Sequence, residues 1–228
     1  RGSVVYPRHQ LPAGQWCEGS PAKAIRPVDA VELRELHEAL RANSRDDAKL
    51  ALLPAHGAIT TRADARSFVA ATVTGTGEIG MGERSSLWFG CVVEAAEHGV
   101  SIGAATNIQD NTILRSSRQR VTIGADCTIG HNVLLHDCVI GDRILVGMGS
   151  MLAPGTIVQN DVLIAAGSTT EPGQVLESGW MWAGRPARQV TRLNERTGQM
   201  AQQAAVIYCD YAVEFAGNQA DELRAAVE

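Results

Sequence analysis

Aliphatic residues recur at every sixth position through much of the chain. The positions are Ile102, Ile108 and Leu114, followed by Leu134, Ile140, Val146, Leu152, Val158, Ile164 and, after Thr170, Leu176. A period of six matches neither the turn of an α-helix nor the two-residue alternation of an ordinary strand. It fits a coil with three faces per turn, in which the aliphatic side chains point into a central shaft. We therefore predict a β-helix over residues 55–182, with inward-pointing side chains at Ile102, Ile108, Ile123, Ile129, Ile140, Val146 and Ile164. An antiparallel β-sandwich is the alternative, but its strands alternate at two and rarely hold one phase for so long.

Two irregularities interrupt this period. After Leu114 the next in-phase residue follows nine positions later, so residues 115–120 are expected to bulge out as a loop. A second step, after Ile129, is only five residues long, and His131 and His136 lie on it. Glycine and small polar residues between the aliphatic positions fit the corners of the coil, because they tolerate the backbone angles of tight turns.

Both ends of the chain are predicted to contain helix. Residues 28–43 place apolar side chains at helical spacing behind Asp29, a residue type that caps helices. Residues 194–228 are rich in Ala, Gln and Glu, and we expect an amphipathic helix there that breaks near Gly217. Its apolar stripe would consist of Met200, Ala204, Ile207, Tyr211 and Phe215. Such a helix would lie along one face of the β-helix.

The N-terminal region contains a partial repeat of the segment that ends the predicted β-helix. The stretch LPAGQWCEGSPAKAIR, which starts at Leu11, matches LESGWMWAGRPARQVT, which starts at Leu176, at a constant offset of 165 residues. Matching glycines and prolines constrain the backbone alike, so both stretches are predicted to follow the same local path. The predicted domains are an N-terminal extension with this repeat and a helix (1–48), the β-helix (49–190) and a helical tail (191–228).

Composition narrows the range of functions. Aromatic residues make up 4% of the chain and hydrophobic residues 45%, so the core must be built mainly from aliphatic side chains. The net charge of −5 argues against a nucleic-acid partner. The five cysteines show no CxxC spacing, so buried free thiols are expected in place of a disulfide framework. No apolar stretch approaches the ~18 residues of a membrane-spanning helix, so no direct membrane span is expected. The first residue, Arg1, fits the removal of a targeting segment as well as an incomplete sequence.

Three groups of polar residues are candidates for chemistry. They are Gln109 and Asp110 in TNIQDNT, His131 and His136 in GHNVLLH, and Glu94 and Glu97 in VEAAEHG. Two neutral imidazoles can share a zinc ion, which usually takes a third protein ligand and leaves one position to water. Because two histidines alone are more often structural, their spacing leaves both interpretations open.

The runs TNIQDNT, VTIGADCTIGHNVLLHDCVIGD, ILVGMGS and WAGRPAR resemble those of the γ-class carbonic anhydrases, in the same order and with similar gaps. The resemblance covers residues 55–190 and implies a mainly β fold, a left-handed parallel β-helix (hexapeptide repeat) with a C-terminal α-helix. It also implies a trimer that hydrates carbon dioxide with zinc held by three histidines at each subunit interface. The tail from Arg192 is similar to that of the γ-carbonic-anhydrase subunits of mitochondrial respiratory complex I, which implies a location on the matrix side of the inner membrane.

Residue by residue, the resemblance implies an incomplete zinc site. His131 and His136 fall on the second and third zinc ligands, and Gln109 with Asp110 on the polar pair near the metal. The first ligand position holds Arg115, whose guanidinium stays protonated and has no lone pair for zinc. The Arg-Gly-Asp stretch of the family falls on Glu94-Ala95-Ala96, so its arginine and aspartate are also absent.

These observations favour a subunit of a trimer that supports the assembly of membrane-bound respiratory complex I and is inactive alone. In the family, the first and third histidines come from one subunit and the second from its neighbour. A homotrimer is therefore expected to hold no zinc, whereas in a heterotrimer with related subunits His131 could complete a site on a neighbour. The alternatives are a working carbonic anhydrase, with water or His98 as a substitute ligand, and a hexapeptide-repeat acyltransferase, which shares the fold.

Overall fold

The computed structural model describes residues 15–18, 23–27, 59–64, 66–95 and 97–225. The chain divides into two compact units, 1–55 and 56–228. The helix predicted at 28–43 lies outside the described residues, as does the first part of the predicted β-helix region before residue 59.

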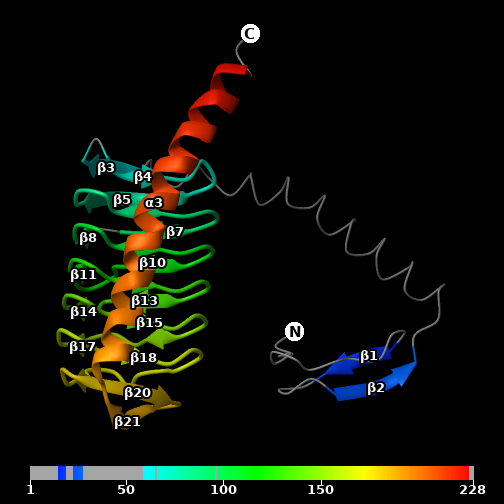
Figure 1. Ribbon diagram of the computed structural model, residues 1–228, viewed down its shortest axis with the longest axis vertical. Coiled ribbons are helices and arrows are strands. Elements are labelled where there is room, and N and C mark those ends of the chain that lie inside the picture. Colours follow the sequence, from blue (N-terminus) through cyan, green and yellow to red (C-terminus); the bar gives the residue numbers. More distant parts are fainter. Residues whose placement is uncertain (1–14, 19–22, 28–58, 65, 96, 226–228) are drawn as a thin grey trace. The chain divides into compact units, whose positions relative to one another are not determined.

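The larger unit is a parallel β-helix whose short strands stack coil upon coil on three faces (Figure 1). The first face, here called the helix face, contains β4 (Phe68–Val69), β6 (Ser86–Leu87), β9 (Asn107–Ile108), β12 (Thr128–Ile129), β15 (Leu145–Val146), β18 (Leu163–Ile164) and β20 (Trp180–Gly184), with β21 (Ala187–Arg192) antiparallel to β20. The second, the site face, contains β7 (Val92–Glu94), β10 (Ile113–Arg115), β13 (Leu134–His136) and β16 (Met151–Leu152). The third, the open face, contains β8 (Val100–Ile102), β11 (Val121–Ile123), β14 (Val139–Ile140), β17 (Ile157–Val158), β19 (Val175–Leu176) and the edge strand β3 (Ile59–Ala63). One long strand, β5 (Thr74–Met81), turns a corner and pairs with both β7 and β8.

The shaft of the β-helix is filled by the predicted aliphatic residues. The seven inward positions named above are all buried, and each pairs with its counterpart in a neighbouring coil, as Ile129 does with Val146. The prediction that Leu134 points inward is wrong, because Leu134 faces outward and the adjacent Leu135 is the buried residue. The six-residue step therefore continues from Ile129 to Leu135, and the five-residue step falls between Leu135 and Ile140. In a strand, adjacent side chains point to opposite sides, so only one of these two leucines can point inward. The sequence alone could not say which one.

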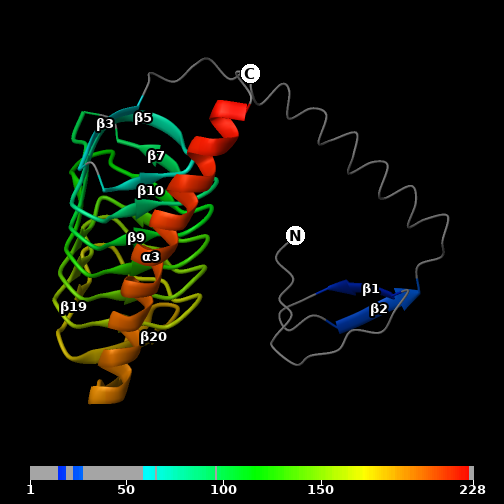
Figure 2. The ribbon, with the colours of Figure 1, turned by 45° about the horizontal axis from the view of Figure 1, so that its top comes forward.

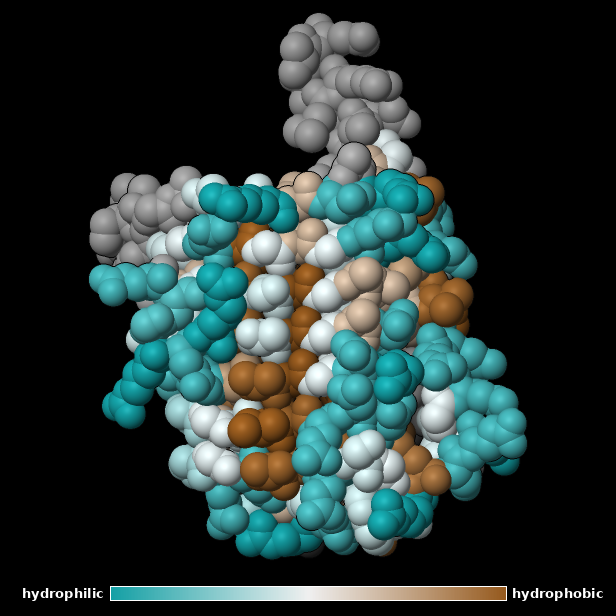
Figure 3. Space-filling view, turned by 90° about the vertical axis from the view of Figure 1, so that its left-hand side faces the viewer, coloured by the Kyte–Doolittle hydropathy of each residue, from teal (hydrophilic) through white to brown (hydrophobic). Residues whose placement is uncertain are grey.

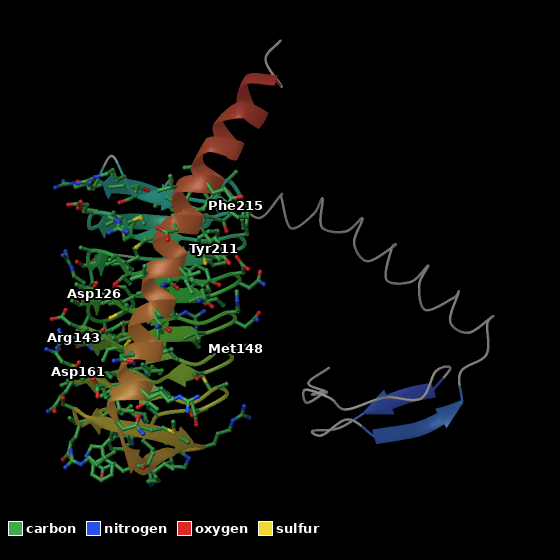
Figure 4. All side chains as sticks on the ribbon, in the orientation of Figure 1. Asp126, Arg143, Met148, Asp161, Tyr211 and Phe215 are labelled. Atoms are coloured by element: carbon green, nitrogen blue, oxygen red, sulfur yellow. The ribbon has the colours of Figure 1, made fainter. Side chains whose placement is uncertain are left out.

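At the corner between the open face and the helix face, residues other than glycine adopt the left-handed backbone conformation. Positive φ angles occur there at Arg84, Ala105, Asp126, Arg143 and Asp161. The Arg143 guanidinium binds the Asp161 carboxylate in a bidentate ion pair, with Nε–Oδ1 and Nη2–Oδ2 distances of 2.7 and 2.9 Å. Figure 4 shows Asp126, Arg143 and Asp161 one above another on this side of the molecule. The coil is therefore held at this corner by side chains in register as well as by small residues.

The helix α3 (Glu195–Ala225) runs along the helix face of the β-helix (Figures 1 and 2). Its aromatic contacts centre on Trp88, whose ring centroid lies 5.3 Å from that of Tyr208 and 5.4 Å from that of Phe215. The break predicted near Gly217 is wrong, because α3 continues through it. No atom lies within 4 Å of a Cβ built at Gly217, so this glycine serves no close packing and is simply tolerated in the helix.

The buried side of α3 also differs from the predicted stripe. Ala205, Cys209 and Ala212 are buried, whereas Ile207 and Tyr211 are 47% and 46% exposed. The small side chains of Ala205, Cys209 and Ala212 allow the helix to lie close to the β-helix. The larger Tyr208 and Phe215 pack against Trp88. The predicted helix and the face it covers are thus observed, but its rotation about its own axis is not the predicted one.

The open face carries a ladder of exposed apolar side chains. Val139, Ile157 and Val175 are 41%, 45% and 45% exposed and pair with one another across successive strands. Figure 3 shows apolar side chains stacked in this way on the side of the molecule where these strands lie. Within the part of the chain that the structure describes, no helix is both long and apolar enough to cross a membrane.

The smaller unit is described by one hairpin. Strands β1 (Gln15–Glu18) and β2 (Lys23–Pro27) pair antiparallel, with a register shift between the second and third residues of β1. The pair β20–β21 has a register shift at the corresponding place, between Met181 and Trp182. The two matching stretches of sequence therefore contain hairpins of the same design.

Candidate metal centre

Asp110 and His131 lie one coil apart at the corner between the helix face and the site face. The Asp110 carboxylate accepts a hydrogen bond from the Phe89 backbone N–H through Oδ1, at 3.1 Å. Its other oxygen, Oδ2, is 3.3 Å from Nδ1 of His131. A carboxylate on one imidazole nitrogen orients the ring and leaves the other nitrogen, here Nε2, available to a metal. Both side chains are partly exposed, so this corner is accessible to a neighbouring chain.

Glu94, Arg115 and His136 form a second column, at the ends of three adjacent strands of the site face. Arg115 pairs in register with Glu94 on one side and His136 on the other. Its guanidinium donates to both carboxylate oxygens of Glu94, through Nε to Oε2 and through Nη2 to Oε1 at 3.3 Å. The hydrogen bond to Glu94 raises the pKa of Arg115 above its usual value. The residue predicted to stand at the first ligand position is therefore a charged guanidinium that is held by an ion pair.

Arg115 is the last residue of β10, so the predicted loop starts one residue later, at Ser116. The loop is held by Asp137, whose carboxylate accepts hydrogen bonds from the backbone N–H groups of Ser117 and Arg118. Burial by itself would raise the pKa of Asp137, but these backbone hydrogen bonds bring it below its usual value. His136 lies beside this cluster, with Nε2 3.3 Å from Ser117 Oγ and 3.5 Å from Asp137 Oδ2.

Gln109 has a different environment from Asp110. Its side chain is buried and donates a hydrogen bond to Asn107 Oδ1 at 3.1 Å, and Asn107 in turn donates to Thr128 Oγ1 at 2.9 Å. This chain of hydrogen bonds links neighbouring coils, so Gln109 contributes to the packing of the β-helix beside the candidate site.

Within one chain the structure does not bring the two histidines together. His131 lies in the turn before β13, whereas His136 is the last residue of that strand. The described residues contain no group of three His, Cys, Asp or Glu side chains that could hold a metal ion. Since Arg115 has no lone pair to offer, the residues present within a single chain do not fit a three-histidine zinc site.

The other candidate ligands do not replace the missing histidine. Glu97 and His98 lie exposed in the turn after β7, and the His98 carbonyl accepts a hydrogen bond from Arg120 Nε at 2.9 Å. Burial raises the pKa of Cys91 to about 11 and that of Cys138 to about 12. Thiols that stay protonated at neutral pH are poor zinc ligands.

Sequence reasoning missed three contributors to this region. The motifs mark Glu94 as a candidate carboxylate but do not indicate that it pairs with Arg115, and Ser117 and Asp137 belong to none of the candidate groups. The signal for the ion pair was the separation of 21 residues between Glu94 and Arg115, the same as between Asp110 and His131. This equals one coil in this part of the molecule, but the coil length becomes known only once the loops are placed.

Comparison with known proteins identifies the family of the chain. It is 42% identical over 137 residues to a carbonic anhydrase of Geobacillus kaustophilus, which corresponds to 60% of this chain and 75% of that protein. It is 33% identical over 167 residues to the mitochondrial γ carbonic anhydrase 1 of Arabidopsis thaliana. The chain is thus a left-handed β-helix protein and belongs to the γ-class carbonic anhydrase family, as its motifs predicted. No family model matches the sequence. The alignments cover 70% of this chain and 61% of the length of that Arabidopsis protein.

Solved structures support the same fold. A hexapeptide transferase family protein from Anaplasma phagocytophilum matches with a TM-score of 0.66 and 30% identity, over 70% of this chain and 98% of that chain. AntD, an N-acyltransferase from Bacillus cereus, matches with a TM-score of 0.53 and 12% identity, over 64% of this chain and 91% of that chain. At 12% identity, the similarity to AntD shows the fold alone.

Proposed function

We propose that this chain is a subunit of a γ-carbonic-anhydrase-like trimer that supports the assembly of mitochondrial respiratory complex I and has no carbonic anhydrase activity alone. The observation that carries the proposal is the ion pair between Arg115 and Glu94, since Arg115 is the residue predicted to stand at the first zinc-ligand position. Hydration of carbon dioxide by this family depends on a metal that lowers the pKa of a bound water. A site with a guanidinium in place of a ligand lacks the means to hold that metal.

A trimer is supported by the outer surface of the site face. Val92, Ile113, Leu134 and Met151 pair in register and form an apolar ladder beside the column of Glu94, Arg115 and His136. At the neighbouring corner, Met148 is 59% exposed, one coil beyond His131. Surfaces of this kind are typical of subunit contacts, and two different patches on each subunit can close a ring with threefold symmetry.

Mitochondrial location and a respiratory-complex partner are supported by the relatives and by the tail. The Arabidopsis relatives are mitochondrial by name, and the tail from Arg192 resembles that of complex I subunits. The ladder of Val139, Ile157 and Val175 on the open face offers a further apolar surface, separate from the site face. We propose that this surface contacts a membrane-bound subunit of the complex on the matrix side. Removal of the protein from cells should then lower the amount of assembled complex I on native gels, and unchanged assembly would contradict this part.

A heterotrimer gives His131 a role that a homotrimer does not. If a related subunit carries intact first and third histidines, His131 would supply the second ligand across the interface, with Nδ1 held by Asp110. The zinc content of such a heterotrimer should then fall by one ion per interface after His131→Ala. Unchanged zinc content in that variant would rule out the contribution in trans.

The test is the mass and zinc content of the purified homotrimer. We expect less than about 0.1 zinc per chain for the native sequence, because a site with two histidines binds zinc much more weakly than one with three. The Arg115→His variant should bind zinc more tightly, by tenfold or more, since it restores the missing ligand. Arg115→Lys is the matched control, because it keeps the charge and supplies no imidazole. Stoichiometric zinc with carbon dioxide hydration in the native homotrimer would support the working enzyme instead.

A further inference from the structure

The hairpin β20–β21 ends the β-helix by adding one more strand to the helix face. Strand β20 pairs parallel with β18, with Leu163 opposite Met181 and Ile164 opposite Trp182. On its other edge β20 pairs antiparallel with β21. The last coil is thus covered by a hairpin whose first strand continues the sheet.

The hairpin β1–β2 repeats this hairpin residue for residue. Its pairs are Gln15 with Pro27, Trp16 with Arg26, Cys17 with Ala24 and Glu18 with Lys23. Adding 165 to each number gives the pairs Trp180 with Arg192, Met181 with Thr191, Trp182 with Gln189 and Ala183 with Arg188. The register shift also falls at the same place in both hairpins. A one-residue difference in register would bring different residues opposite one another. The agreement in register therefore means that the two hairpins have the same strand pairing.

The sequence supplies a physical reason for the repeat. Gly184 adopts a φ of 110°, and a Cβ at that position would lie 3.1 Å from the carbonyl oxygen of Pro186. A glycine is therefore favoured at this position of the turn, and the other stretch also has a glycine there, Gly19, followed by Pro21 as Gly184 is followed by Pro186.

The two hairpins differ in whether the outer edge of their first strand is paired with a further strand. In the described residues β1 pairs only with β2, so its other edge, which corresponds to the β18 edge of β20, has no strand partner there. In the β-helix of this chain the edge of β18 that would accept such a strand is already paired with β20. An edge strand with unpaired N–H and C=O groups is a template for adding a further strand.

We propose that β1–β2 is a docking hairpin that adds, as a parallel strand, to the last coil of a second left-handed β-helix of the same family. It would use the register in which β20 pairs with β18, so that Trp16 and Cys17 lie opposite the last aliphatic pair of the partner coil. Backbone hydrogen bonds provide the affinity in this mode, and the alternating side chains provide the specificity. The partner is a β-helix whose own final edge is uncovered. Docking of β1–β2 would not require zinc in either β-helix.

The first test exchanges the hairpins within the full chain. Residues 176–191 are replaced by the sequence of residues 11–26, and a control carries the same sixteen residues in shuffled order. A hairpin of the same design should leave a cooperative thermal transition, with a Tm within about 5 °C of the native chain, whereas the shuffled control should lose about 10 °C or more. If the exchanged chain melts like the shuffled control, β1–β2 is not a terminal hairpin and the proposal is overturned.

The second test identifies the partner in the native assembly. A photo-crosslinking residue at position 17 should form its main product with a chain of the γ-carbonic-anhydrase family, at the last coil of its β-helix. The β1 amides should also exchange at least tenfold more slowly in the assembly than in the purified chain. Crosslinks to lipid, to an unrelated protein or to the β-helix of this same chain would overturn the proposal, as would equal exchange in both samples.

Discussion

Asp161 combines a charge and an unusual backbone conformation at a single residue. It has a φ of 57°, and its carboxylate is paired with Arg143, which has a φ of 58°. The hydrogen bond from Arg143 holds the pKa of Asp161 below its usual value. A carboxyl group with a lowered native pKa adds stability above its unfolded pKa of about 3.9, and this stability is lost as the pH falls through the native value.

This predicts different outcomes for two substitutions. Asp161→Asn removes the ion pair but keeps a residue type that tolerates positive φ, so it should cost less than about 1 kcal/mol at pH 7 because both side chains are partly exposed. Asp161→Ala should cost about 1–2 kcal/mol more, since alanine adopts a positive φ, as Ala105 does, only without the local side-chain hydrogen bonds that favour Asn and Asp there. Urea unfolding at pH 7 and below pH 4 measures both effects, and the cost of the Asn variant should shrink at the lower pH. Equal costs for Asn and Ala at pH 7 would contradict the assignment.

Arg115 shows what single residues reveal and what they do not. The identity of the side chain is enough to exclude it as a zinc ligand, whatever the fold. The ion-pair partner of Arg115 cannot be identified in this way, because Glu94 lies 21 residues away and becomes a neighbour only through the stacking of coils. The sequence therefore predicted the loss of a ligand at residue 115, and the structure shows that Arg115 forms an ion pair with Glu94.

At the scale of the elements, two valines on consecutive strands test which positions point inward and which point outward. Val146 on β15 is 0% exposed, whereas Val139 on β14 is 41% exposed on the open face. Val146→Asp buries an unpaired charge in the shaft and should cost more than about 3 kcal/mol, or prevent folding. Val139→Asp should cost less than about 1 kcal/mol. A circular-dichroism melt of each variant provides the measurement, and similar losses in both would contradict the assignment of inward and outward positions.

The two elements that were placed wrongly share a cause. In β13 the sequence offers two adjacent leucines, and in α3 it offers apolar residues on more than one side of the helix. Periodicity predicts that an element has a buried side, but with several apolar residues available the shape of the opposing surface decides which one is buried. For α3, Trp88 on the helix face contributes to this choice, because it packs against Ala212 and Tyr208, and Ile207 and Tyr211 stay exposed.

At the scale of the whole molecule, the site face and the open face are expected to serve different partners. Ile113→Asp places a charge in the apolar ladder of the site face and should weaken the proposed trimer by tenfold or more. Ile157→Asp is the matched control, because the same change on the open face lies away from the site face. Sedimentation or native mass spectrometry of both variants at equal concentration separates them. If Ile157→Asp dissociates the trimer and Ile113→Asp does not, the assignment of the two faces is reversed.

The sequence by itself determined the six-residue pitch, the composition of the shaft, the helix that follows it and the family, because these depend on the order of residue types along the chain. Its motifs also predicted where His131, His136 and Arg115 would fall in the family's site. Only the tertiary structure decided which residues meet between coils: Asp110 with His131, Glu94 with Arg115, and Asp137 with the loop after β10. The physical reason is that such contacts depend on the length of each coil, and that length is set by loops and corners whose geometry no period predicts.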